Sequence, residues 1–233
     1  GEFLAAQAVW HQLPGYSATD MVEQFRRHGL DEMRCEALAT RDNAYRIGAP
    51  QVPGRHERMF DGDEIRIGAY TWRVIVGFGH APEHASLYCA ELGILIAGDM
   101  LLPRISTNVS VYAATPHGDP LGWFINSLRE FCTLPDDTLV LPSHGKPFKG
   151  IRARVDQLVE HHRERCEVLM AACHTPKSAA ALLPTLFPRE LDTHQVMFAM
   201  GEAIAHLNYL EKSGALSRQT DEHDLIRFTP CPQ

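Results

Sequence analysis

The apolar residues of positions 1–50 follow the spacing of amphipathic helices. They recur every three or four residues, and polar residues able to cap a helix stand ahead of the second and third runs. We predict a first helix over residues 3–9, a second that begins after Ser17 or Thr19, and a third that Asp31 caps and that extends through Tyr45. These helices are expected to lie on a sheet formed later in the chain.

From Met59 the pattern changes to short runs of β type. An irregular loop spans residues 103–118, and an amphipathic helix follows it from about Asp119. Charged and apolar residues alternate in the first run and apolar residues dominate the others, at positions 64–67, 72–76, 86–90, 94–97 and 138–141. The pattern predicts an α/β fold, and its most informative residues stand where the strands end.

From Gly150 onward the pattern is helical again. The sequence predicts a long helix from Ile151 and two further helices over residues 178–186 and 193–212, followed by two short strands that flank a polar turn. Three helices and a two-stranded ribbon indicate a winged-helix module. We therefore predict two domains, an α/β domain over residues 1–150 and an α-rich, winged-helix-like domain over residues 151–233.

Composition and charge argue against membrane and nucleic-acid partners. The 233 residues, 45% of them hydrophobic, can form a packed core, and they contain neither a membrane-spanning apolar run nor the basic start of a signal peptide. We therefore expect a cytoplasmic protein with no membrane partner. The net charge of −7, and the lack of Lys and Arg in residues 193–210, argue against the nucleic-acid partner that a winged helix would suggest.

Three polar residues stand where predicted strands end. His80 lies in the segment Gly79-His-Ala-Pro-Glu-His84, Asp99 ends the run at 94–97, and His144 follows the run at 138–141. A carboxylate at the end of an apolar strand is costly unless it is paired or binds metal, and neutral imidazole is the commonest metal ligand in proteins. The three residues are therefore candidate metal ligands.

Each of these residues also has an ordinary explanation. The two histidines of residues 80–84 could stabilise a turn, Asp99 could cap a helix or a turn, and His144 could be structural. The segment also fits the inverted zincin pattern H-x-x-E-H, in which a helix would present both histidines and Glu83 would act as general base. The strand pattern that follows disfavours such a helix.

The order of these elements is more specific than any one of them. Over residues 61–150 a strand with G-H-x-x-x-H, a strand with Gly-Asp, a helix, and a strand with His-Gly resemble the later motifs of the metallo-β-lactamase superfamily, in the glyoxalase II order. In that family the first His binds one metal, the Asp bridges two metals and the last His binds the second. The resemblance implies that His80, Asp99 and His144 are ligands and that His84 contacts a ligand without binding metal.

One signature of that family is missing. The motif H-x-H-x-D-H, which supplies further ligands to both metals, does not occur in the 233 residues. We therefore expect the chain to begin after this motif and to represent the second half of the family's αβ/βα sandwich. Because a catalytic zinc site needs about three protein ligands, we expect two divalent metals in the full-length protein, zinc or else iron or manganese, and weak or absent metal binding in this chain.

A half sandwich would also expose an apolar sheet face. Large exposed apolar patches are uncommon on monomers, so we expect self-association or another chain to cover this face.

The resemblance implies a hydrolase in which a metal-bound hydroxide attacks an ester, thioester, lactone, amide or phosphodiester of a small-molecule substrate. No catalytic side chain is assigned beyond the metal ligands. Candidate substrate contacts lie in the long loop after Asp99 and are Arg104, Asn108, Tyr112 and His117. The alternative function is a non-catalytic binding or assembly module that has lost its metal centre.

Overall fold

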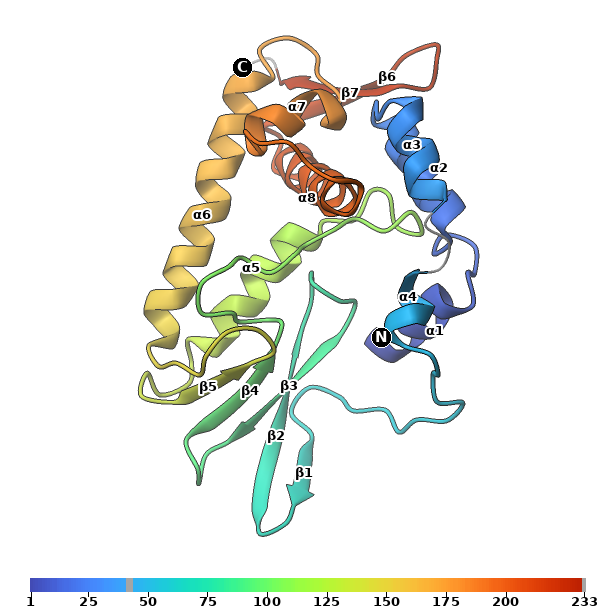
Figure 1. Cartoon of the computed structure of the whole chain (residues 1–233). Coiled ribbons are helices and arrows are strands. Elements are labelled where there is room, and N and C mark those ends of the chain that lie inside the picture. Colours follow the sequence, from blue (N-terminus) through green and yellow to red (C-terminus); the bar gives the residue numbers. More distant parts are fainter. Residues whose placement is uncertain (41–43, 232–233) are drawn as a thin grey trace. The chain divides into compact units, whose positions relative to one another are not determined.

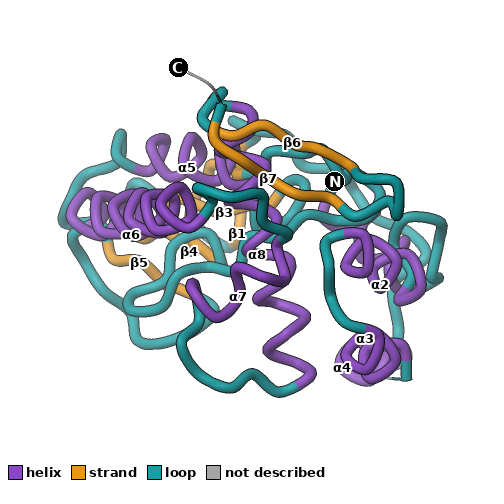
Figure 2. Tube along the Cα trace, turned by 90° about the horizontal axis from the view of Figure 1, so that it is seen from above, coloured by secondary structure: helices purple, strands orange, loops and turns teal. Residues whose placement is uncertain are grey.

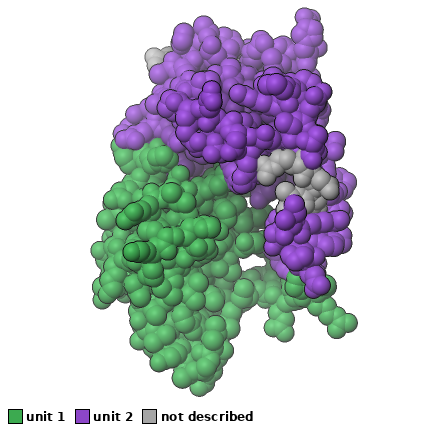
Figure 3. Space-filling model, in the orientation of Figure 1, with its two compact units in different colours: residues 1–2, 53–109, 122–161 green, residues 3–52, 110–121, 162–233 purple. Residues whose placement is uncertain are grey.

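The chain folds into two compact units, which we describe separately (Figure 3). The computed structural model describes residues 1–40 and 44–231. Unit 1 comprises residues 1–2, 53–109 and 122–161, and unit 2 comprises residues 3–52, 110–121 and 162–233. Both units therefore combine segments that lie far apart in the sequence.

Unit 1 is built on a five-stranded sheet whose strands follow one another in chain order, β1-β2-β3-β4-β5 (Figure 1). The first three pairings are antiparallel, whereas β4 and β5 are parallel. The strands are β1 (Glu64–Ile67), β2 (Tyr70–Gly77), β3 (His84–Cys89), β4 (Ile94–Gly98) and β5 (Leu139–Pro142). Most of α5 (Pro120–Phe131) and the first half of α6 (Ile151–Ala172) complete the unit.

This topology brings three strand ends to one edge of the sheet. β2 and β4 are both antiparallel to β3, so they run in the same direction, and β5 runs parallel to β4. The carboxyl ends of β2, β4 and β5 therefore lie at the same edge, where the loops that follow these strands begin.

One face of the sheet is buried at β4 and β5. Leu95 and Ala97 of β4 and Val140 of β5 expose no surface. Figure 1 shows α5 and the start of α6 beside β4 and β5. Large side chains of α5 are buried to the same degree, namely Phe124, Leu128 and Phe131. Removing these apolar side chains from water, at about 25 cal/mol per Å², is the main source of stability for this layer.

The opposite face carries an apolar row that is only partly covered. Val74, Leu87, Ile96 and Leu141 are neighbours across β2, β3, β4 and β5. Val74 is buried, Leu87 and Leu141 are half-buried, and Ile96 is 39% exposed. The cover of this face by a second copy or another chain stays a prediction.

Unit 2 is mainly helical. Helix α8 (Thr193–Lys212) is its best buried element, with Met200, Ile204 and Leu207 fully inaccessible. The hairpin of β6 (Leu216–Thr220) and β7 (Ile226–Pro230) follows α8, and its two strands lie side by side in Figures 1 and 2. The remaining helices are α1 (Glu2–Trp10), α2 (Ala18–Arg27), α3 (Glu32–Ala39), α4 (Ala44–Gly48), α7 (Ala179–Leu186) and the second half of α6.

Capping residues set the starts of several of these helices. Ser17, Asp31 and Ser178 each accept a hydrogen bond from a backbone N–H three residues later, at the starts of α2, α3 and α7. Ser17, not Thr19, is therefore the cap of the second helix. No helix within residues 1–40 and 44–231 combines the length and the hydropathy needed to cross a membrane.

Two predicted elements have different boundaries in the structure. The third helix was predicted to run from Asp31 through Tyr45, but α3 ends at Ala39 and α4 begins at Ala44; residues 41–43 of that prediction lie outside the described residues. Strand β3 begins at His84, because the ladder with β2 extends to the Gly77–His84 pair. His84 therefore lies on a strand and not in a loop, which rules out the zincin helix.

The two units also divide the chain differently from the predicted boundary at residue 150. Residues 3–52 and 110–121 group with the C-terminal helices, because compact units are defined by contacts and not by chain order. The C-terminal part has the predicted three helices and a hairpin. The boundary itself and the assignment of this part as a winged helix stay predictions.

His28, directly after α2, is a buried histidine of unit 2 with a strongly perturbed pKa. It is 1% exposed, and its ring stacks on Phe228 with 6.1 Å between the ring centroids. Burial, together with Arg218, Arg27 and His117, lowers the pKa of His28 from 6.5 to about 3. Folded His28 is therefore neutral at a pH where the unfolded chain already carries the proton.

We expect His28 to destabilise the protein in acid. From pH 6.5 down to about 3 the unfolded chain binds a proton that the folded chain excludes, so the free energy of unfolding falls as the pH falls. When the pH is lowered from 7 to 5, the free energy of unfolding, measured in urea, should fall by about 2 kcal/mol more for the wild type than for His28→Gln. His174→Gln, at an exposed histidine, should follow the wild type. The same pH dependence in wild type and His28→Gln would contradict this expectation.

Candidate metal centre

Residues that follow three strands meet at one edge of the sheet in unit 1. His80 stands three residues after β2, Asp99 directly after β4, and His144 two residues after β5. The carboxyl ends of these strands share an edge, so the three side chains converge although they are far apart in the sequence. The structure thus brings together the three ligands that the sequence analysis proposed.

The carboxylate of Asp99 lies between the two imidazoles. Its Oδ2 is 3.6 Å from Nε2 of His80, and its Oδ1 is 3.5 Å from Nε2 of His144. Oδ1 is buried and has no hydrogen-bond partner in the described part of the chain. The side chains of His80 and Asp99 are 26% and 27% exposed, whereas that of His144 is 67% exposed. The centre therefore opens to solvent at His144.

A hydrogen bond at Nδ1 of His80 requires that this nitrogen carries a proton. Its Nδ1 lies 2.9 Å from the backbone oxygen of Asn108, and a carbonyl oxygen only accepts, so Nδ1 donates. In neutral His80 the Nε2 atom is then an acceptor that faces a carboxylate oxygen of Asp99. Two acceptors repel each other unless a cation lies between them. Metal-binding histidines commonly have this arrangement, with the second nitrogen donating to a carbonyl.

His84 contacts the main chain of Asp99. The backbone N–H of Asp99 donates to Nε2 of His84 at 3.4 Å, and burial lowers the pKa of His84, which favours the neutral ring that can accept. The His84 ring also lies 6.2 Å from the ring of His80, centroid to centroid. His84 is therefore placed to position Asp99, as the resemblance implied.

Two side chains that the sequence analysis missed tie the loop after Asp99 to its surroundings. The hydroxyl of Thr107 donates to the backbone oxygen of Asp99. Arg154 of α6 donates from Nε to the oxygen of Leu102 at 2.6 Å and from Nη2 to that of Ile105 at 2.9 Å. Both residues bind backbone oxygens, whose positions depend on the fold, so no sequence motif could have found them.

The donor set fits part of a metal centre. A carboxylate with a buried, unpartnered oxygen and two imidazoles whose Nε2 atoms face it are ligand types that zinc, iron and manganese accept. Among the described residues, no group of three His, Cys, Asp or Glu side chains could hold one ion alone. His80 and His144 each share Asp99, and a closed site needs further ligands.

The four predicted substrate contacts are divided between the two units. Arg104 and Asn108 belong to unit 1, where Arg104 is exposed and the backbone oxygen of Asn108 holds His80. Tyr112 and His117 belong to unit 2, where the ring of Tyr112 lies 5.9 Å from that of Tyr16 and His117 bonds to Arg218. Their roles as substrate contacts stay predictions.

Comparison with known proteins decides the family. The sequence model described as "Metallo-beta-lactamase superfamily" matches residues 9–144, more than half of the chain. The chain belongs to the metallo-beta-lactamase superfamily. A second model, "Metallo-beta-lactamase-like, C-terminal domain", matches residues 166–231, which span the end of α6, helices α7 and α8 and the β6–β7 hairpin.

Two solved structures share the fold. A beta-lactamase domain protein from Burkholderia ambifaria is 48% identical, with a TM-score of 0.84 over 89% of this chain and 60% of that chain. The metallo-beta-lactamase family protein TTHA1429 from Thermus thermophilus is 30% identical, with a TM-score of 0.80 over 99% of this chain and 70% of that chain.

A curated relative from Bacillus subtilis carries the name "Probable metallo-hydrolase YqjP". It is 31% identical over 155 residues, which cover 64% of this chain and 48% of that protein. The chain thus spans about half the length of this relative.

The family match is wider than the predicted resemblance. The sequence analysis placed it over residues 61–150, whereas the match begins at residue 9 and includes the N-terminal helices. The prediction that the chain holds only the second half of the family domain is not supported, because N-terminal family sequence is present. The N-terminal part of the match carries no short ligand motif, so motifs alone could not reveal its family resemblance.

Substitution of Gly98 tests how tightly the backbone just before Asp99 packs against the His84 ring. The φ of Gly98 is +55°, and a Cβ there would lie 2.4 Å from the His84 ring, whereas Gly93, with φ +61°, has open space around it. Gly93→Ala should lower the free energy of unfolding by about 1–2 kcal/mol, because alanine is strained in a left-handed backbone conformation. Gly98→Ala should cost about 2–4 kcal/mol in urea unfolding, because overpacking adds to it. Equal costs for the two variants would contradict close packing at Gly98.

Proposed function

We propose that this protein is a metal-dependent hydrolase and that His80, Asp99 and His144 are its metal ligands in this chain. The observation that carries the proposal is the Asp99 carboxylate, which faces the Nε2 atoms of both histidines at 3.6 and 3.5 Å. For neutral His80 this arrangement sets two acceptors, Nε2 and the Asp99 carboxylate, against each other, and a divalent cation shared by the carboxylate would make it favourable. Membership of the metallo-beta-lactamase superfamily supports the same function.

Each residue has a distinct part in this proposal. Asp99 would bridge two ions, with His80 on one and His144 on the other. The ions, zinc or else iron or manganese, would supply a nucleophilic hydroxide near neutral pH and polarise the bond under attack. The backbone oxygen of Asn108 would keep the His80 lone pair directed at its ion, and His84 would hold the main chain of Asp99.

The substrate in this proposal is a small molecule with an ester, thioester, lactone, amide or phosphodiester bond. The exposure of His144, at 67%, supports entry of this molecule from solvent at that end of the centre. The name of the Bacillus subtilis relative supports hydrolysis and leaves the bond open.

A second candidate function is a binding or assembly module without catalysis. It is favoured by the finding that no three His, Cys, Asp or Glu side chains of the described residues could hold one ion. In such a module a proton on Nε2 of His80, and not a metal, would relieve the repulsion at Asp99.

Metal content and turnover distinguish the two functions. Protein produced from its whole coding sequence should contain zinc, iron or manganese by elemental mass spectrometry and should hydrolyse at least one model ester, thioester, lactone, amide or phosphodiester. Asp99→Asn keeps the shape of the side chain and removes its charge, so it should lower the metal content and reduce kcat/KM about 100-fold or more. Asp137→Asn, at an exposed aspartate of unit 1, should change neither.

Three results would change these assignments. Equal metal content in Asp99→Asn and wild type would show that Asp99 is not a ligand. Bound metal without turnover on the whole panel would favour the binding module. The 233-residue chain alone should bind zinc weakly or not at all, because its three ligands are divided between two ions, and full occupancy would overturn that expectation.

A further inference from the structure

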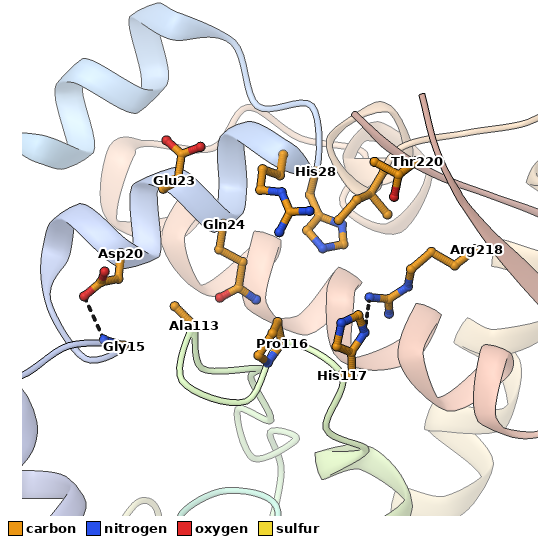
Figure 4. A pocket seen from close by; sticks show the side chains of 12 residues that line it. Gly15, Asp20, Glu23, Gln24, His28, Ala113, Pro116, His117, Arg218 and Thr220 are labelled. Carbon is orange, nitrogen blue, oxygen red and sulfur yellow. Dashed lines mark hydrogen bonds between the residues drawn. The ribbon is translucent and has the colours of Figure 1, made fainter. Parts of the chain in front are cut away.

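Unit 2 contains a cavity of about 330 Å³ that shares no residue with the centre around Asp99. Helix α2, the loop at residues 113–117 and the β6–β7 hairpin line it. Figure 4 shows Gln24 and His28 of α2, His117 of the loop and Arg218 of β6 around this space. The volume is at the lower end of the range for small-molecule sites.

The carboxylates at the rim of the cavity are already engaged. Asp20 accepts hydrogen bonds from Ser17 and from the backbone N–H of Gly15, and these bonds lower the pKa of Asp20. Glu23 forms an ion pair with Arg26 at 2.6 Å. In Figure 4 the carboxylate of Asp20 is turned toward Gly15, and both acids lie at the end away from His117 and Arg218. These acids have little capacity left to attract a cation.

Arg218 and His117 form a hydrogen-bonded pair at the other end, and Nη2 of Arg218 also donates to Oδ1 of Asn208 at 2.6 Å. Nη1 of Arg218 lies 2.7 Å from Nδ1 of His117, and a guanidinium only donates, so Nδ1 accepts. The proton of neutral His117 is therefore on Nε2, and the exposed ring can offer it to a bound molecule. The Arg218 side chain is 9% exposed, and neither its Nε nor Nδ1 of the buried His28 has a hydrogen-bond partner among the described residues.

The two arginines of the lining, Arg27 and Arg218, are paired with carboxylates that do not line the cavity. Glu211 pairs with Arg218 at 2.7 Å and Asp224 pairs with Arg27 at 2.7 Å. Burial nevertheless lowers the pKa of Arg218, and after burial the nearby Arg218, Arg27 and His117 contribute to the lowered pKa of His28. A negative charge in the cavity would offset the desolvation of the guanidinium and the positive potential at His28.

We propose that this cavity binds a small organic anion with a carboxylate or phosphate group. The anionic oxygens would accept a hydrogen bond from Nε2 of His117 and lie against the guanidinium of Arg218, since charge-assisted bonds to guanidinium groups are among the strongest in proteins. Ala113, Pro116 and Ile226 would contact the carbon body of the ligand. The proposal does not depend on the metal centre, because the two sites have no residue in common.

Nuclear magnetic resonance of the histidine side chains, on the full chain near pH 7.5, tests this proposal. The probes are inorganic phosphate, phenyl phosphate and benzoate, each compared with sodium chloride at the same ionic strength. Phosphate or benzoate should produce a saturable shift of the His117 ring signals. The probe that does so shows whether the cavity binds a phosphate or a carboxylate group. Phenyl phosphate should bind more tightly than inorganic phosphate if the apolar wall contacts the ligand.

Variants keep the test independent of folding. His117→Ala, at an exposed loop position, should weaken binding of the saturating probe about tenfold, measured on the backbone amide of Thr220. His174→Ala, an exposed histidine outside the cavity, should bind like the wild type. The proposal is overturned if no probe gives a saturable shift beyond that of chloride, or if His117→Ala binds as tightly as the wild type.

Discussion

The position of one carboxylate constrains most of unit 1. Asp99 directly follows the buried strand β4, and its Oδ1 is itself buried without a hydrogen-bond partner among the described residues. Such a group is costly unless a cation compensates it. Its surroundings hold it in place nonetheless: His84 accepts its N–H, Thr107 donates to its backbone oxygen, and Gly98 permits the close approach. The sheet edge is therefore organised around the carboxylate of Asp99, which faces Nε2 of His80 and Nε2 of His144.

Two histidines show how one hydrogen bond determines what the other ring nitrogen can do. In unit 1, Nδ1 of His80 donates to the oxygen of Asn108, which leaves Nε2 as an acceptor suited to a metal ion. In unit 2, Nδ1 of His117 accepts from Arg218, which leaves Nε2 as a donor suited to an anion. The same side chain thus supports opposite ligand chemistry, and the partner at Nδ1 makes the difference.

Two observations bear on function in different ways. The chain belongs to the metallo-beta-lactamase superfamily, but it supplies only a few candidate metal ligands. The family match from residue 9 supports a metal-dependent hydrolase. Under the proposed function, the residues around Asp99 would supply one shared carboxylate and one imidazole for each ion, fewer than a closed catalytic site needs.

The sequence by itself determined the elements and the candidate ligands. Apolar periodicity located the strands and helices, Ser17 and Asp31 marked helix starts, and the order of His80, Asp99 and His144 after strands indicated the candidate ligands, because these signals are local. Only the tertiary structure placed His84 on β3, tied Arg154 to the loop after Asp99, and grouped α2, residues 113–117 and the β6–β7 hairpin around one cavity. Those features depend on strand register and on contacts between distant segments, which no local pattern encodes.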